Sequence, residues 1–180
     1  MLTAMSFARL FAALGLAALA TACAPTLGPP PPGPMSSGPV AFSAQDFAWS
    51  KAAGGNTVAG MVAYREGPVR FTCAGSSVVL TPETAWSRRR MAVLYGSPDR
   101  AAVPTDEVRA RTPSAPPGDA GPFVRRTTCD DAGRFSLSGL PDGGWFVITI
   151  ARPVGQSQGS SVALMRRVVT RGGKPQTVAL

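Results

Sequence analysis

Histidine is absent from the 180-residue sequence, and its absence narrows the functions that the chain can have. Histidine is the commonest general base, and without it no Ser–His or Cys–His pair can activate a nucleophile. A zinc site is not expected either, because only three cysteines are present and they lie far apart. The neighbouring carboxylates of Asp130 and Asp131 lack the further spaced acids of a calcium loop. We therefore expect a non-catalytic protein with no metal and no other cofactor.

Long apolar runs are also missing beyond the N terminus. Arg9 precedes an apolar run, residues 10–22, that ends in three small residues. This is the three-part layout of a secretory signal. At roughly 13 residues the run is shorter than the ~20 that a membrane-spanning helix needs. We expect residues 1–22 to be a signal peptide and the exported protein not to span a membrane.

Residues 20–23, Ala-Thr-Ala-Cys, resemble the lipobox of bacterial lipoproteins. In that family the cysteine, here Cys23, takes a diacylglyceryl group and becomes the mature amino terminus. The resemblance implies stable anchoring by two or three acyl chains. Ala24 replaces the aspartate that favours inner-membrane retention, so the resemblance implies the outer membrane, with the domain in the periplasm or at the cell surface. An ordinary signal-peptidase site is the alternative, because small residues before the cleavage point fit that rule as well.

The cysteine count bears on this choice. Cys23, Cys73 and Cys129 make an odd number, which leaves one thiol unpaired within an exported chain. If Cys23 carries lipid, Cys73 and Cys129 remain as a pair in an oxidising compartment, where disulfides persist. Their bond would close a loop of about 56 residues and stabilise the fold by about 4 kcal/mol. Two separate buried thiols are the alternative.

A proline-rich stretch separates the signal from the rest of the chain. Residues 24–41 carry almost no charge, and residues 29–32 are all proline. This composition favours an extended spacer, although a ligand for a proline-binding groove has the same composition. We assign residues 23–41 to the lipidated cysteine and a linker, and residues 42–180 to one domain of ordinary size.

Short β-branched or alternating segments follow one another through the domain, which predicts an all-β fold. Residues 145–150 are apolar on both faces, so we expect this strand in the middle of a sheet. Asp130 and Gly133 predict a hairpin turn between two strands. The expected strands, seven or eight in all, are residues 57–64, 69–72, 76–81, 123–129, 134–138, 144–152, 161–170 and 176–180.

Residues 131–147, Asp-Ala-Gly-Arg-Phe-Ser-Leu-Ser-Gly-Leu-Pro-Asp-Gly-Gly-Trp-Phe-Val, resemble the D-x-x-G-x-F-x-F-x-x-L-P-x-G-x-Y/W-x-V signature of carboxypeptidase regulatory-like domains. Residues 60–64 and 77–82 are similar to the opening of that family. The resemblance covers residues 56–155 and implies an antiparallel, immunoglobulin-like or prealbumin-like β-sandwich. It implies little about activity, because such domains serve as non-catalytic stalks and binding modules.

An insertion, residues 82–122, departs from the family pattern. Thr81 as N-cap, a following proline and an acid in the first turn predict one short helix over residues 83–95. Trp86 would lie on the helix face that packs against the sandwich. Residues 96–121 are rich in proline, alanine and charge, and they predict a long loop.

The net charge of the sequence is +8, and arginine provides most of the positive charge. Arg88, Arg89 and Arg90 form the densest run, and we expect them to project largely into solvent. They are the candidate contacts for an anionic ligand, because arginine forks suit phosphates and carboxylates of the envelope. A plain solvated basic face is the alternative. Nucleic acid is not an expected partner of an exported protein.

Two functions are consistent with these features. The first is a non-catalytic envelope lipoprotein that displays a β-sandwich for structural or protein–protein contacts. The alternative is a binding module for an anionic envelope glycan or lipid. In both, a lipid anchor joins the protein to the membrane.

Replacing the lipidated cysteine tests the anchor. We expect Cys23→Ser to move the protein from the membrane fraction into the soluble periplasm, because the acyl chains that hold it would be lost. Cell fractionation and immunoblotting measure the change. Retention of the Cys23→Ser protein in the membrane would contradict the assignment.

Overall fold

The computed structural model describes residues 40–156 and 160–180. The chain divides into two units, residues 1–37 and 38–180, and the described residues all belong to the second. The predicted signal peptide, Cys23 and nearly all of the predicted linker therefore lie outside the described residues. Among the described helices, none is both long enough and apolar enough to cross a membrane.

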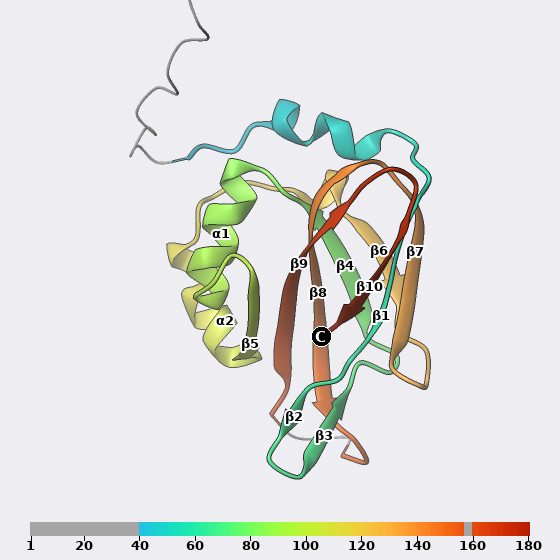
Figure 1. The fold of residues 1–180 in the computed structure, drawn as a ribbon. Coiled ribbons are helices and arrows are strands. Elements are labelled where there is room, and N and C mark those ends of the chain that lie inside the picture. Colours follow the sequence, from blue (N-terminus) through green and yellow to red (C-terminus); the bar gives the residue numbers. More distant parts are fainter. Residues whose placement is uncertain (1–39, 157–159) are drawn as a thin grey trace, which may run out of the picture. The chain divides into compact units, whose positions relative to one another are not determined.

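Ten strands and five short helices are present in the described residues (Figure 1). The strands are β1 (Asn56–Met61), β2 (Arg65–Glu66), β3 (Val69–Thr72), β4 (Ser77–Pro82), β5 (Arg100–Pro104), β6 (Arg125–Thr128), β7 (Arg134–Leu140), β8 (Gly143–Pro153), β9 (Val162–Thr170) and β10 (Pro175–Ala179). The helices are α1 (Ala85–Tyr95), α2 (Thr105–Arg111) and the 3-10 helices η1 (Ala44–Lys51), η2 (Thr112–Ser114) and η3 (Gly121–Phe123). The predicted all-β sandwich is confirmed, with more strands than the seven or eight expected.

Two sheets form the sandwich. The smaller has the order β10-β1-β7, in which β1 is parallel to β10 and antiparallel to β7. The larger has the order β2-β3-β8-β4-β6, and β9 joins it by pairing with β8 and β5. The main core contains buried side chains of both sheets, namely Val58, Cys73, Val78, Leu80, Cys129, Phe135, Leu137, Leu140, Trp145, Val147 and Val178.

A third layer covers part of the outer face of the larger sheet. Figure 1 shows α1 and α2 on one side of this sheet and the smaller sheet on the other. Met91 and Leu94 of α1 belong to a second buried cluster with Phe146 of β8 and Met165 of β9. The larger sheet is therefore apolar on both faces over part of its area.

Strand β8 is central, as the sequence predicted. It pairs with β3, β4 and β9. Trp145 and Val147 belong to the main core, whereas Phe146 belongs to the cluster under the helices, and all three are fully buried. Burial on both faces explains why this segment shows no polar alternation.

A buried asparagine holds the Leu-Pro-Asp part of the family-like signature. The Asn56 side chain donates from Nδ2 to the Leu140 carbonyl at 2.9 Å and to Asp142 Oδ1 at 2.8 Å. Its Oδ1 accepts from the Lys174 amide at 3.1 Å. Both donors and the acceptor of the amide are therefore satisfied, as a buried polar group requires. This one side chain links β1 to the turns that follow β7 and β9.

The N-terminal helix η1 is an element that the sequence did not predict. Phe47 of η1 is buried among the rings of Phe42, Trp86 and Phe123, with centroid distances of 5.2–5.8 Å between neighbouring pairs. These rings connect η1 to α1 and η3. Residues just after the linker are thus part of the folded domain.

The predicted inserted helix is present, but it begins at Ala85 with Thr84 as its N-cap. Thr84 and Ser87 form a capping box, in which each side chain bonds the other residue's backbone amide. Thr81 was expected to be the N-cap but belongs to β4, because the ladder with β8 continues to Pro82. Because the backbone of Thr81 is paired in the sheet, the N-cap lies three residues later, at Thr84.

The prediction of a long loop over residues 96–121 is wrong. This segment contains β5, α2 and η2, and η3 begins at its last residue. Strand β5 pairs with β9 from Arg100 opposite Arg166 to Pro104 opposite Val162. Because only Val103 of β5 is buried, its own sequence carries little β signal. Its partner comes from a strand much later in the chain, so a local pattern could not reveal it.

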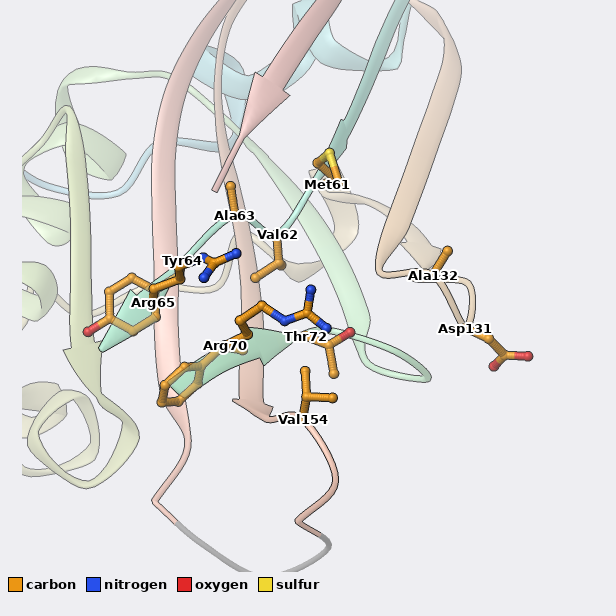
Figure 2. A pocket seen from close by; sticks show the side chains of 11 residues that line it. Met61, Val62, Ala63, Tyr64, Arg65, Arg70, Thr72, Asp131, Ala132 and Val154 are labelled. Atoms are coloured by element: carbon orange, nitrogen blue, oxygen red, sulfur yellow. The ribbon is translucent and has the colours of Figure 1, made fainter. Parts of the chain in front are cut away.

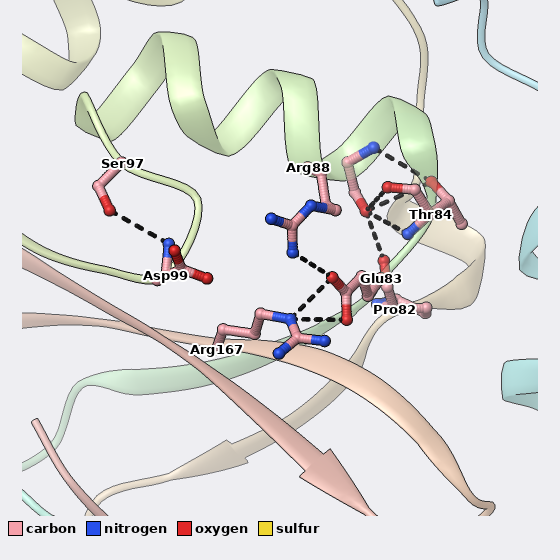
Figure 3. Close-up of polar contacts among 8 residues, drawn as sticks. Pro82, Glu83, Thr84, Arg88, Ser97, Asp99 and Arg167 are labelled. Carbon is pink, nitrogen blue, oxygen red and sulfur yellow. Dashed lines mark hydrogen bonds and ion pairs between the residues drawn. The ribbon is translucent and has the colours of Figure 1, made fainter. Parts of the chain in front are cut away.

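Glu83 joins α1 to the larger sheet (Figure 3). Its carboxylate accepts from Arg88 Nη1 at 2.6 Å and from Arg167 Nε at 2.8 and 2.9 Å. Burial acts to raise the pKa of Glu83, but the hydrogen bonds and charges of the two arginines together outweigh it and lower the pKa. A side chain at Gly144 would collide with this carboxylate. The glycine before Trp145 therefore makes room for the ion pair.

Truncation of the central indole should destabilise the domain strongly. Trp145 is 0% exposed, and its Nε1 donates to Thr170 Oγ1 at 3.1 Å. We expect Trp145→Ala to lower the free energy of unfolding by about 3–5 kcal/mol, because the mutation leaves a cavity in the main core. Urea unfolding measures this value, and Val69→Ala, at an exposed residue, serves as a control. A loss near zero would contradict the role of β8 as the central strand.

The Glu83 ion pairs should make stability depend on acidity. The folded pKa is lowered, so the contribution is complete above the unfolded pKa and disappears as the pH falls through the folded pKa. We expect Glu83→Gln to cost about 1 kcal/mol at pH near 7, a modest value because solvent screens the partly exposed arginines. The difference from the wild type should shrink at pH near 3. Urea unfolding at both pH values tests this, with Asp106→Asn, at an exposed residue, as the control. A stability difference between Glu83→Gln and the wild type that is equal at both pH values would contradict the expectation.

Candidate functional site

An open pocket lies beside the β2–β3 hairpin (Figure 2). Its volume is about 470 Å³, within the usual range of small-ligand sites. We call it the arginine pocket, and it is lined by Met61, Val62, Ala63, Tyr64, Arg65, Arg70, Phe71, Thr72, Asp131, Ala132 and Val154. Three parts of the chain supply these residues: the 61–72 segment, the 130–133 turn and the residue after β8.

Two arginines of the pocket lie directly opposite each other. A Gly-Pro turn joins β2 to β3, and Gly67 has a left-handed φ of 57° that glycine adopts without strain. The turn pairs Arg65 with Arg70. Directly opposed residues of an antiparallel ladder project from the same face, with Cβ atoms about 5 Å apart. Figure 2 shows both guanidinium groups on the pocket side of the hairpin.

Neither arginine of this pair forms an ion pair within the described residues. The ion pairs found there involve Glu83, Asp106 and Glu107 with other arginines. Arg65 and Arg70 are both exposed. Like charges placed directly opposite each other destabilise a ladder, so the pair carries an electrostatic cost that a bound anion would offset.

A disulfide fixes the wall opposite the hairpin. The predicted bond between Cys73 and Cys129 is confirmed, and it joins the end of β3 to the start of the 130–133 turn. Asp130 Oδ1 accepts two backbone amides of this turn, at 2.7 and 3.0 Å, which confirms the predicted turn and the role of Asp130. Asp131 is exposed on the rim, and Figure 2 shows its carboxylate directed away from the two arginines.

Apolar groups complete the pocket. The Tyr64 and Phe71 rings pack edge to face with centroids 5.1 Å apart. Met61 and Val154 are 46% and 49% exposed, although both are large hydrophobic residues. Cations beside an aromatic ring and exposed apolar side chains suit a ligand that has negative groups and apolar faces. An acidic sugar has this combination.

The three arginines predicted as ligand contacts do not form one exposed patch. Consecutive residues point about 100° apart around a helix. Arg88 pairs with Glu83, and Arg90 donates to the Pro116 carbonyl at 2.6 Å. Arg89 alone of the three is exposed. The expectation that all three project into solvent is therefore wrong, because two of them hold the insertion in place.

The sequence analysis missed the arginine pocket, although part of its signal is local. In Arg-Glu-Gly-Pro-Val-Arg, residues 65–70, the arginines occupy mirror positions around a two-residue turn. Such a turn places mirror positions directly opposite each other. The remaining walls, residues 131–132 and Val154, come from distant parts of the chain, and no local pattern connects them.

Comparison with known proteins gives a fold relative but no family. No family model matches the chain, and no curated protein matches it. The structure is similar to a crystal structure from Pseudomonas aeruginosa that is provisionally described as a carbohydrate-binding protein. The TM-score is 0.53 and the sequence identity is 20%, over 77% of this chain and 96% of that chain. At this identity the likeness shows the fold alone.

Proposed function

We propose that this protein is a non-catalytic, lipid-anchored protein of the bacterial cell envelope whose β-sandwich binds an anionic envelope glycan in the arginine pocket. The observation that carries the proposal is the directly opposed pair of Arg65 and Arg70, neither of which forms an ion pair in the described chain. A phosphate or carboxylate between two guanidinium groups accepts charge-assisted hydrogen bonds from both. Arginine is suited to this task because its donors form a planar fork.

The other pocket residues favour a glycan over a bare inorganic anion. Tyr64, Met61 and Val154 offer apolar surface next to the arginines, and the C–H faces of sugar rings are apolar. The fold relative from Pseudomonas aeruginosa, with its provisional description as a carbohydrate-binding protein, supports the same class of ligand. The sequence alone favoured structural or protein–protein contacts, and the arginine pocket moves our proposal to the alternative, ligand binding.

The N-terminal features suit display of such a module. The lipobox-like residues 20–23 would attach the chain to the membrane, and the proline-rich linker would hold the domain away from the lipid. The disulfide between Cys73 and Cys129 is compatible with an oxidising, exported location. In this arrangement the domain meets envelope polymers while the anchor keeps it at the membrane.

Neutralising the arginine pair tests the proposed ligand. We expect Arg65→Gln/Arg70→Gln to weaken binding of delipidated, phosphorylated lipopolysaccharide oligosaccharide at least about tenfold, because two charge-assisted hydrogen-bonding groups are lost. Titration calorimetry at ordinary ionic strength measures the dissociation constant. Wild-type binding should also weaken as salt is raised, because salt screens exposed charges.

A matched control separates local recognition from net charge. Arg89→Gln/Arg126→Gln removes the same total charge from two exposed arginines outside the pocket. We expect its dissociation constant to stay within about twofold of the wild-type value at ordinary ionic strength, where distant charges are screened. Equal losses in both double variants would refute a specific site at the arginine pocket, as would the absence of binding to the wild type.

A further inference from the structure

A second pocket lies on the outer face of the larger sheet, beside α2. Its volume is about 600 Å³, and it shares no lining residue with the arginine pocket. We call it the tyrosine groove, because the end of α1 contributes Tyr95 to it. Its size is that of a site for a small organic molecule.

The floor of the groove is an apolar surface made by three strands. Alternate residues of β8 face outward, and Ile148 and Ile150 follow Phe146 on this face. In the ladder, Ile148 lies opposite Val79 of β4, and Ile150 lies opposite Ala163 of β9. Ile150 is 40% exposed. The helices thus cover one end of this apolar face and leave the other end open.

Helix α2 forms one wall of the groove. Its lining residues are Thr105, Val108 and Arg109, and Thr112 at the start of η2 continues the wall. They are spaced by three and four positions, which places them on one side of a helix. Thr105 and Thr112 already hydrogen-bond within the protein, and Arg109 pairs with Asp106. Because these polar groups are already engaged within the protein, the wall offers a ligand mainly van der Waals contact.

Tyr95 lines the groove, and its hydroxyl is a polar group without a partner among the described residues. Tyr95 is 8% exposed, and no described residue hydrogen-bonds its hydroxyl. Every buried side-chain polar atom in the described chain has a partner, so the hydroxyl oxygen is accessible to solvent. Burial raises the pKa of Tyr95 to about 12, although the charge of Arg90 acts in the opposite direction. The hydroxyl is therefore a donor at neutral pH.

A cation marks the open end of the floor. Arg152 follows Ile150 on the same face of β8 and lines the groove. Its guanidinium donates to Ser76 Oγ at 3.3 Å and pairs with no acid in the described chain. The row Ile148, Ile150 and Arg152 thus runs from buried apolar surface to an exposed positive charge.

We propose that the tyrosine groove binds a linear apolar chain that ends in a carboxylate, as in a medium-chain fatty acid anion. The carboxylate accepts from Arg152 at the open end. The chain lies over Ile150, Ile148 and Val79 and is covered on one side by α2. A second oxygen function along the chain, where the ligand has one, accepts from the Tyr95 hydroxyl. This site is independent of the proposed glycan site, because the two pockets have no residue in common.

Calorimetric titration with decanoate tests the proposal. The full-length Cys23→Ser protein is used, because this substitution removes any acyl chain of its own, and decanoate is kept below its micelle concentration. We expect decanoate to bind saturably at one site. Decanol should bind at least about fivefold more weakly, because it lacks the charge that Arg152 recognises. No saturable binding, or equal affinities for decanoate and decanol, would overturn the assigned ligand class.

Substitutions locate the site. We expect Ile150→Glu to weaken decanoate binding at least about tenfold by placing a carboxylate on the apolar floor, and Arg152→Gln to weaken it about fivefold or more. Val169→Glu is the matched control, because Val169 is 38% exposed and lies outside the groove; its effect should stay within twofold. Unchanged binding in Arg152→Gln, a surface substitution that leaves the core intact, would overturn the proposal, as would equal effects of Ile150→Glu and Val169→Glu.

Discussion

Both faces of β8 are buried, and the layers of the domain follow from that constraint. Trp145 and Val147 need a cover on one side, which the smaller sheet provides, and Phe146 needs one on the other, which α1 provides. Full burial of each such side chain stabilises the fold by about 1.5–3 kcal/mol. If the outer face were uncovered, the domain would lose this contribution for several side chains. The inserted residues between β4 and β6 are therefore part of the core architecture and not an appended loop.

Polar contacts hold these layers in register at a few positions. Glu83 connects α1 to β9 through Arg167, and Asn56 connects the smaller sheet to the turns after β7 and β9. Both side chains are hydrogen-bonded to partners within the domain, which is the condition under which burial of polar groups is tolerated. The disulfide adds a covalent link between the end of β3 and the start of the 130–133 turn. Arginine provides most of the positive charge of the chain, and some of its side chains, such as Arg167, stabilise the fold through internal ion pairs.

Both candidate sites lie where the cover of β8 ends. Ile150 and Arg152 line the tyrosine groove, and Val154, just beyond the strand, lines the arginine pocket. The helical layer does not extend over this end, so Ile150 and Val154 remain exposed there, as do Arg65, Arg70 and Arg152. A binding module needs such surface on a rigid framework.

The sequence by itself indicated the local features: the central strand at 145–150, the 130–133 turn and the presence of a helix after β4. It favoured the pairing of Cys73 with Cys129 and left two separate thiols as the alternative. Each depends on alternation, turn chemistry or cysteine number, which neighbouring residues or simple counting reveal. Only the tertiary structure decided that 96–121 is ordered, since β5 depends on β9, and that Arg88 and Arg90 serve structure while Arg65 and Arg70 face a pocket. The reason is physical: whether an arginine is free or paired depends on which distant carboxylate or carbonyl the fold brings within hydrogen-bond distance, and sequence spacing does not encode that distance.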